Sequence, residues 1–207
     1  MVTISRNLKR LVYLISPNKI YPNFYIQLNK VLASNKVSFF QLRLKNKSPD
    51  EIIKIAKKIK NITKKYNVKL IINDNSVIAK KVNADGCHLG QNDDSIELAR
   101  KNNKKKIIGV TCHGSKELAL TAYKNKCDYI AFGSFFNSRL KPKAKKTDLK
   151  ILSWAKKNIK KPIVVIGGIT DKNYKKLMNA GANYIAISTF IWNNPLLKPE
   201  IAIKKFL

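Results

Sequence analysis

Residues 83–90 read NADGCHLG, and their outline returns in KCDYIAFG at 126–133 and in GANYIAIS at 181–188. In each of these segments the end of a helix-like stretch leads through Asp or Asn into a short apolar strand. Repetition of one helix–strand junction is typical of stacked, equivalent βα units. The repeat therefore predicts parallel strands that alternate with helices.

The polar residue of each junction stands at an equivalent position: Asp85, Asp128 and Asn183. Short side chains of this kind hydrogen-bond readily to nearby backbone groups. We expect all three to hold backbone where a strand begins, which removes Asp85 from the candidate catalytic residues.

Short runs rich in β-branched and aromatic residues alternate with amphipathic stretches along the whole chain. The candidate strands are 11–16, 37–43, 68–73, 86–89, 106–111, 129–133, 162–167 and 184–188. Eight βα units in a chain of 207 residues predict a TIM barrel. An open flavodoxin-like sheet, which normally needs only five strands, is the weaker alternative. Helices are expected to begin at the capping motifs Ser48–Glu51, Thr147–Asp148 and Thr170–Asp171.

Length and composition fit one globular domain, which we expect to span residues 1–207. No apolar run approaches the roughly 20 residues of a membrane span, and the apolar stretch before Ser16 is too short for a secretory signal. These features predict a cytoplasmic protein that does not associate with membranes. The three cysteines lack metal-ligand spacing and are odd in number, which argues against a disulfide framework.

The formal net charge of +30 has two interpretations. Clustered Lys and Arg would indicate binding to nucleic acid, because they neutralise phosphates. Lysines on the polar side of helices, as in IIKIAKKIKNITKKY at 52–66, would instead form a solvated coat. The lysines are spread along the chain and no aromatic-rich basic arm is present, so the coat is favoured. Either interpretation predicts attraction of anionic substrates.

The few acidic residues can be sorted by position. Several stand at apparent helix starts: Asp50, Glu51, Asp148, Asp171 and Glu200. Asp94 precedes SIELAR and is expected to cap that helix. Asp74 and Asp93 remain, each just beyond the carboxyl end of a strand, where barrels place their active sites. The two carboxylates could bind Mg²⁺, or both could be loop caps.

Polar residues with strand spacing follow the second candidate strand. Gln41, Arg43 and Lys45 alternate and therefore point the same way from an extended backbone. Two cations and an amide on one side indicate a site for an anion or a heterocycle. Ion pairing on an exposed strand is the alternative.

Near the other end of the chain, VIGGIT at 165–170 puts Gly167 and Gly168 between a strand and a helix. Backbone N–H groups there can approach a phosphate, and barrels commonly bind phosphate after strands seven and eight, where Ser188 and Thr189 also fall. A tight turn is the alternative role for the two glycines. The long connection at 132–148 could close over a phosphorylated substrate through its lysines, or form a solvated charge run.

The order of these motifs resembles the thiamine phosphate synthase family over most of the chain, from LVYLISP to YIAIST. The motifs that carry the resemblance are QLRLK (41–45), INDN (72–75), ADGCHLGQND (84–93), GVTCH (109–113), FGSFFNSRLK (132–141) and IGGI (166–169). The resemblance implies that the pyrimidine diphosphate is bound by Gln41, Arg43, Lys45, Asn73, Thr111 and Lys141. It implies that the thiazole phosphate is bound by Ser138, Gly168, Ser188 and Thr189. It implies Mg²⁺ as the cofactor, on Asp74 and Asp93.

The implied activity is that of a transferase. The family condenses 4-amino-2-methyl-5-pyrimidinylmethyl diphosphate with a thiazole phosphate, giving thiamine phosphate and pyrophosphate. Arg43, Lys45 and Lys141 would be catalytic by stabilising the departing pyrophosphate. No protein nucleophile is then needed, so His88 and His113 are interpreted as structural. The expected partners are phosphorylated small molecules rather than nucleic acid. The sequence is compatible with a homo-oligomer and does not decide the oligomeric state.

Two alternatives come from other classes of protein. One is a thiazole tautomerase-like barrel, which would act on a single thiazole phosphate without metal; the presence of both Asp74 and Asp93 argues against it. The other is a basic barrel that binds nucleic acid.

The chain departs from the family pattern at a few positions. Leu44, Asn75 and Thr111 stand where the family usually has Glu, Arg and Ser. The loop at 137–141 reads NSRLK in place of Pro-Thr-x-Thr-Lys, so Leu140 supplies no second hydroxyl.

Overall fold

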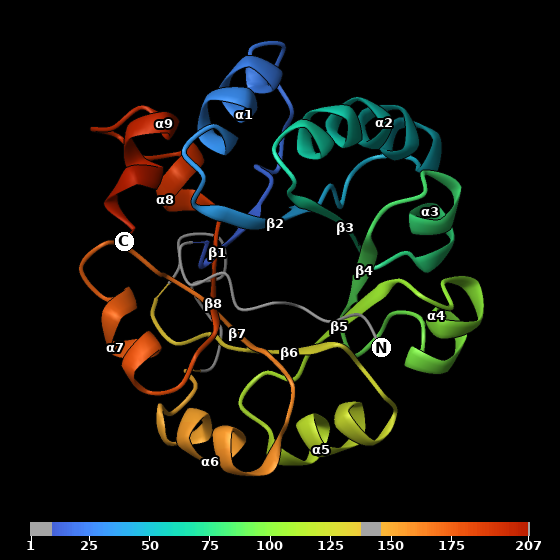
Figure 1. The fold of residues 1–207 in the computed structure, drawn as a ribbon, viewed down its shortest axis with the longest axis vertical. Coiled ribbons are helices and arrows are strands. Elements are labelled where there is room, and N and C mark those ends of the chain that lie inside the picture. The colour runs from blue at the N-terminus through green and yellow to red at the C-terminus, as the bar shows by residue number, and fades with distance from the viewer. Residues whose placement is uncertain (1–9, 138–145, 207) are drawn as a thin grey trace.

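The chain folds into a closed barrel of parallel strands, ordered β1 to β8 around the ring. The computed structural model describes residues 10–137 and 146–206. Strands line the centre, helices surround them, and the colour runs once around the ring from β1 to β8 (Figure 1). The predicted TIM barrel is confirmed, and the open sheet is excluded.

Each strand begins and ends within one residue of the run expected to form it. The strands are β1 (Val12–Ile15), β2 (Val37–Leu42), β3 (Lys69–Asn73), β4 (Gly86–Leu89), β5 (Ile107–Thr111), β6 (Tyr129–Phe132), β7 (Ile163–Ile166) and β8 (Tyr184–Ile187). The helices are α1 (Phe24–Leu32), α2 (Pro49–Lys65), α3 (Ser76–Lys81), α4 (Ile96–Asn102), α5 (Lys116–Lys124), α6 (Lys150–Asn158), α7 (Tyr174–Asn179), α8 (Thr189–Trp192) and α9 (Pro199–Ala202), followed by the 3-10 helix η1 (Ile203–Lys205).

Two apolar layers form because successive residues of a strand point to opposite faces. The barrel interior is filled by Tyr13, Ile15, Phe39, Ile71, Ile107, Tyr129, Ala131, Val164, Tyr184 and Ala186. The outward residues of the strands, such as Val12 and Leu14, join a larger cluster with helix residues such as Leu28. Polar residues that continue the inward series at the carboxyl ends of the strands therefore meet above the interior cluster.

The repeated junctions make the same hydrogen bond three times. At each one, a backbone N–H of the preceding strand donates to the junction side chain. The donors Leu70, Ile108 and Ile163 lie 2.9, 2.8 and 2.8 Å from Asp85, Asp128 and Asn183 respectively. The structural role predicted for these three residues is confirmed.

The capping motifs were predicted with mixed success. At α2 the Ser48 hydroxyl accepts from the Glu51 N–H while the Glu51 carboxylate accepts from the Ser48 N–H, which confirms the capping box. Asp148 accepts from the Lys150 N–H at 2.9 Å where α6 begins. The start expected at Thr170–Asp171 was wrong, because α7 begins only at Tyr174.

Asp94 does not cap α4, contrary to expectation. The N-cap of α4 is Ser95, whose hydroxyl accepts from the Leu98 N–H at 3.1 Å. Asp94 instead reaches the first residue of α3, accepting from the Ser76 N–H at 3.2 Å and the Ser76 hydroxyl at 2.5 Å. Asp94 precedes α4 in the sequence, but the fold brings the start of α3 within hydrogen-bonding distance of its carboxylate.

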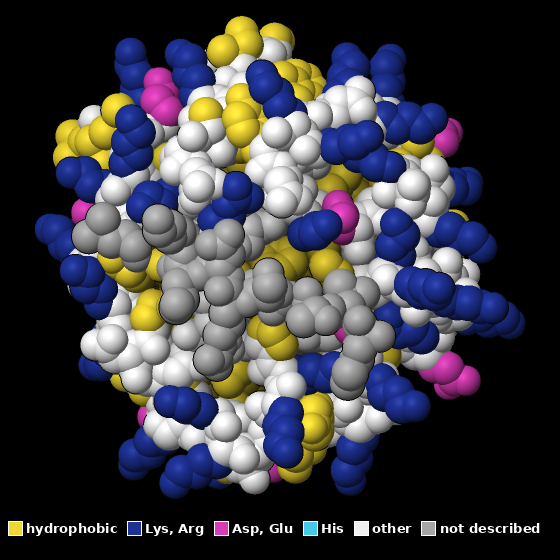
Figure 2. Space-filling model, in the orientation of Figure 1, with side chains coloured by type: hydrophobic (Ala, Val, Ile, Leu, Met, Phe, Trp, Pro, Cys, Tyr) yellow, Lys and Arg dark blue, Asp and Glu magenta, His cyan; other side chains and the backbone are white. Residues whose placement is uncertain are grey.

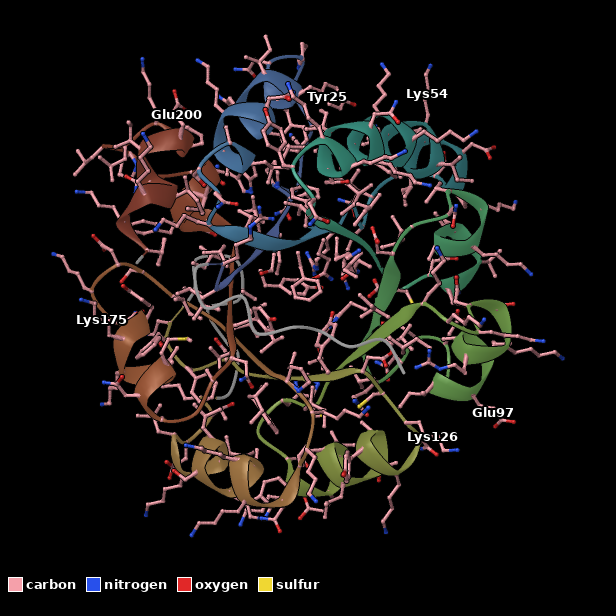
Figure 3. The ribbon with its side chains drawn as sticks, in the orientation of Figure 1. Tyr25, Lys54, Glu97, Lys126, Lys175 and Glu200 are labelled. Atoms are coloured by element: carbon pink, nitrogen blue, oxygen red, sulfur yellow. The ribbon has the colours of Figure 1, made fainter. Side chains whose placement is uncertain are left out.

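Charged side chains cover the outside of the ring. Lys54, Glu97, Lys126, Lys175 and Glu200 all point away from the barrel (Figure 3). Lysine and arginine side chains are distributed around the rim of the face in Figure 2 rather than gathered in one patch. This distribution matches the solvated coat favoured by the sequence.

Cys87, Cys112 and Cys127 are all buried free thiols. Along the described chain, no helix combines the length and apolar character that crossing a bilayer requires.

Candidate active site

The carboxyl ends of the strands surround a cavity of about 640 Å³. All the expected site residues that lie in the described chain line it: Gln41, Arg43, Lys45, Asn73, Asp74, Asp93, Thr111, Gly168, Ser188 and Thr189. Ser138, Leu140 and Lys141 lie outside the described residues. Side chains from distant parts of the sequence thus share one cavity, at the face where barrel enzymes place their active sites.

An amide pair lies where β2 and β3 approach the cavity. The Gln41 side-chain Nε2 donates to the Asn73 Oδ1 at 2.5 Å, and Gln41 is buried with only 3% of its surface exposed. With this bond made, the Gln41 carbonyl oxygen and the Asn73 NH₂ group remain for a ligand. Such a pair suits a heterocycle that presents an amino group near a ring nitrogen.

Asp74 and Asp93 form a close carboxylate pair. Asp74 directly follows β3 with a φ of +65°, a left-handed conformation that Asp adopts more readily than most residues. Asp93 is held by the Gly90 N–H, which lies 2.6 Å from its Oδ2. Burial, followed by hydrogen bonding and like-charge repulsion from Asp93, raises the pKa of Asp74 to about 6.

Two cations lie near this pair. Lys45 and Arg43 act electrostatically on Asp74 and offset part of the rise in its pKa. The Arg43 backbone is held by Ser16, whose hydroxyl accepts from the Arg43 N–H at 3.0 Å and donates to the Arg43 carbonyl at 3.3 Å. A guanidinium and an ammonium beside two carboxylates suit a ligand that carries both phosphate groups and a metal ion.

The donor set of the carboxylate pair fits Mg²⁺. All its ligand atoms are oxygens, and a bound cation would relieve the repulsion that raises the Asp74 pKa. Within the described residues, no group of three or more His, Cys, Asp or Glu side chains is placed to hold a metal. Mg²⁺ commonly binds through one or two carboxylates together with substrate phosphate, so two are sufficient.

The wall formed by β7 and β8 carries glycines and hydroxyls. Gly167 and Gly168 have φ values of +108° and +60°, and a Cβ on Gly168 would lie 2.3 Å from the Asn137 carbonyl oxygen. In the described part of the chain, the Gly168 N–H has no hydrogen-bond partner. The Ser188 hydroxyl donates to the Ser16 carbonyl at 3.1 Å. A backbone N–H at a glycine turn suits a phosphate group.

His88 lines the cavity as part of a buried chain of hydrogen bonds. Its Nε2 lies 2.7 Å from the Thr111 hydroxyl, and its Nδ1 lies 2.8 Å from the Tyr129 hydroxyl. The Tyr129 hydroxyl in turn lies 2.7 Å from that of Tyr13. Burial lowers the pKa of His88 to about 4, so the ring is neutral at pH 7.

Several lining residues were not anticipated from the sequence. They are Asn18, Gly90, Asn92, His113, Ser134, Asn193 and Asn194. Loops after strands have no periodic pattern that would single them out. The available signal was position, since most of these residues closely follow a predicted strand.

A family model described as thiamine monophosphate synthase matches residues 12–191. The chain belongs to the thiamine monophosphate synthase family. A thiamine-phosphate synthase of Pelagibacter ubique is 52% identical over 198 residues, covering 95% of this chain and 96% of that protein. One from Erythrobacter litoralis is 38% identical, covering 88% of each protein.

A solved structure is also similar. The thiamine phosphate pyrophosphorylase from Pyrococcus furiosus is 28% identical, with a TM-score of 0.85 over 97% of this chain and 94% of that one. Members of the thiamine monophosphate synthase family are transferases, so this chain is an enzyme and the resemblance is confirmed. The comparisons give no support to a tautomerase-like or a nucleic-acid-binding barrel.

Two departures from the family motifs have a structural role here. Leu44 is buried, with 6% of its surface exposed, in the layer between strands and helices. Asn75 caps α3, because its Oδ1 accepts from the Ile78 N–H at 2.8 Å. Neither side chain is among those lining the cavity.

Proposed function

We propose that this enzyme joins 4-amino-2-methyl-5-pyrimidinylmethyl diphosphate to a thiazole phosphate, forming thiamine phosphate and pyrophosphate. The observation that carries the proposal is the meeting of a carboxylate pair, two cations and an amide pair in one cavity. The names of the relatives support the same reaction.

The amide pair would hold the pyrimidine. The Gln41 carbonyl can accept from the exocyclic amino group, and the Asn73 NH₂ can donate to a ring nitrogen or a nearby phosphate oxygen. Because these two amides also bind each other, a ligand meets a preorganised pair. Preorganisation lowers the entropy cost of binding and orients the methylene carbon for reaction.

The diphosphate would lie against Arg43 and Lys45, next to the Asp74–Asp93 pair. The bond between the methylene carbon and the diphosphate oxygen breaks, and its electron pair leaves with pyrophosphate. The amino-substituted ring stabilises the resulting cation, and the thiazole nitrogen then supplies the pair for the new C–N bond. The two cationic side chains stabilise the charge that develops on the leaving group. Mg²⁺ held by Asp74 and Asp93 would supply further positive charge at that group.

The thiazole phosphate would occupy the wall of β7 and β8. The N–H of Gly168, which has no hydrogen-bond partner among the described residues, and the backbone at Ser188–Thr189 provide donors suited to a phosphate monoester. Ser138 and Lys141 remain predicted ligands. No side chain needs to act as a nucleophile in this scheme, because the thiazole nitrogen fills that role.

The direct test is to incubate purified protein with both phosphorylated substrates and Mg²⁺ and to measure thiamine phosphate. We expect product only when both substrates and the metal are present. Product that persists in full after chelation would contradict the metal assignment, and the absence of product with all components would contradict the function.

Single substitutions test the carboxylate pair. Asp74→Asn and Asp93→Asn each remove an anionic ligand, and we expect each to lower activity by about two orders of magnitude or more. The matched control is Asp50→Asn, because Asp50 is an exposed residue in the first turn of α2. It should retain wild-type activity, with all three variants showing the circular dichroism of the folded barrel.

A further inference from the structure

The barrel interior contains polar groups that the proposed reaction does not use. Tyr13 on β1 and Tyr129 on β6 lie within the apolar interior cluster, each 1% exposed. Their hydroxyls are 2.7 Å apart, and the series continues through His88 on β4 to the hydroxyl of Thr111 at the end of β5. A line of hydrogen bonds thus runs from the buried core to the cavity.

Counting protons restricts the direction of these bonds. A charged imidazole would donate from both ring nitrogens and leave the buried Tyr13 hydroxyl without an acceptor in the series, so the geometry favours a neutral ring. The three hydroxyls and a neutral imidazole carry one mobile proton each, whereas the series contains only three contacts. One donor is therefore left without a partner inside the series. A buried donor without an acceptor is costly, so the left-over proton should stand where an acceptor is available.

Among the described residues, only one end of the series offers an acceptor. Within residues 10–137 and 146–206, the Tyr13 hydroxyl has Tyr129 as its one hydrogen-bond partner, and Tyr129 has only Tyr13 and His88. Thr111 lines the cavity, where water or an anionic ligand can accept. The His88 ring is 8% exposed, and no described carboxylate hydrogen-bonds to it.

We propose that all the donors point toward the cavity, from the two tyrosines through His88 to Thr111. His88 is then the Nε2–H tautomer: its Nδ1 accepts from Tyr129, and its Nε2–H donates to the Thr111 oxygen. The remaining proton belongs to the Thr111 hydroxyl, which is presented as a donor to an anionic oxygen of the ligand. Tyr13, Tyr129 and His88 are positioning residues in this arrangement.

The arrangement has a functional consequence that rests on the proposed function. A freely rotating hydroxyl can offer either its proton or its lone pairs, whereas here the lone pair facing His88 is already engaged. Thr111 therefore meets a phosphate oxygen with its donor orientation set in advance, and it disfavours a ligand that would donate to it. The buried tyrosines contribute to anion binding without touching the ligand.

The tautomer can be measured directly in the unmodified protein. Long-range ¹H–¹⁵N correlation spectra of histidine-labelled, ligand-free protein at neutral pH report which ring nitrogen carries the proton. The chain has only two histidines, so His88→Gln assigns the signal by its loss. We expect a neutral ring protonated at Nε2. An Nδ1–H tautomer or a doubly protonated ring would overturn the proposed direction.

A matched pair of Tyr→Phe variants tests the positioning role. Tyr129→Phe removes the donor to His88, whereas Tyr184→Phe removes a hydroxyl from the same interior cluster that has no hydrogen-bond partner in the described chain. We expect Tyr129→Phe to weaken binding of inorganic pyrophosphate with Mg²⁺ by roughly 3- to 10-fold, measured by calorimetry, and Tyr184→Phe to bind as wild type. Equal binding by wild type and Tyr129→Phe would refute the positioning role.

The tautomer measurement and the binding measurement together distinguish failure of this inference from failure of the proposed function on which it rests. Wild-type protein that binds no pyrophosphate and makes no thiamine phosphate would refute the proposed function. The tautomer is measured without ligand and decides the direction of the hydrogen bonds in that case too. The same measurement decides the direction of the hydrogen bonds if Tyr129→Phe fails to fold.

Discussion

At the scale of single residues, Asp74 supplies a carboxylate to the proposed site but lowers the stability of the folded protein when it is ionised. Its pKa in the folded protein is raised from 3.8 to about 6, through burial and then the proximity of Asp93. Between these two values the folded chain holds a proton that the unfolded chain has released. The contribution of Asp74 to stability therefore falls as the pH rises through this range.

This linkage predicts that Asp74→Asn is more stable than wild type at neutral pH when metal is chelated, although it loses activity. The neutral amide avoids the repulsion from Asp93 that the ionised carboxylate experiences. Thermal unfolding in chelator should give the variant the higher Tm at pH 7, with the difference shrinking as the pH is lowered through about 6 toward 4. A Tm difference independent of pH would show that Asp74 is not perturbed in this way.

At the scale of elements, the start of α3 and the loop before α4 are joined close to the carboxylate pair. Asp94 accepts two hydrogen bonds from Ser76, and the Asn103 side chain donates to the Ser76 carbonyl at 2.8 Å. Ser76 lies two residues after Asp74, and Asp94 is adjacent to Asp93. The contact therefore ties together the two loops that carry the proposed metal ligands.

Asp94→Ala should accordingly weaken both the fold and metal binding. Losing hydrogen bonds to a half-buried carboxylate costs about 2 kcal/mol, which corresponds to a Tm lower by roughly 4–8 °C in a domain of this size. Calorimetric titration should also show weaker Mg²⁺ binding in the presence of pyrophosphate. The matched control, Asp50→Ala on the exposed first turn of α2, should change stability by less than about 0.5 kcal/mol. A wild-type Mg²⁺ affinity in Asp94→Ala would show that the loops are held by other contacts.

At the scale of the whole molecule, the chain carries a net charge of +30, and the proposed site takes anionic substrates. Raising the ionic strength from about 0.01 to 0.15 M shortens the screening length from about 30 to 8 Å. We expect kcat/KM for the pyrimidine diphosphate to fall several-fold over this range, because long-range attraction is screened, while kcat changes much less. Steady-state kinetics at a series of salt concentrations with Mg²⁺ held constant would measure this. A salt-independent kcat/KM would mean that the coat does not steer substrates.

The same coat distinguishes the enzyme from a nucleic-acid-binding protein. A dispersed coat binds oligonucleotides weakly, and that binding should vanish by about 0.15 M salt. Fluorescence anisotropy with single-stranded and duplex oligonucleotides provides the measurement. Tight binding that survives this salt concentration would point to a localised basic patch instead.

The sequence by itself determined the barrel and most of its described site. Short runs rich in β-branched and aromatic residues located β1 to β8 to within a residue at each end, because parallel strands buried on both faces are apolar along their length. The position of Gln41, Arg43, Asn73 and Asp74 at strand ends also followed from sequence, since parallel strands bring their carboxyl ends to one face. The repeated junctions also predicted that Asp85 bonds to backbone where a strand begins, because equivalent βα units place the same kind of residue at the same point.

Only the tertiary structure decided contacts between residues that no local pattern relates. Tyr13 and Tyr129 are 116 positions apart, yet their hydroxyls meet inside the barrel, where the sequence shows only two ordinary strand tyrosines. Asp94 bonds to Ser76 rather than to the helix that follows it. Such partners depend on how closed strands and packed helices bring side chains together in space. The spacing of residues along the chain does not predict which side chains meet in space.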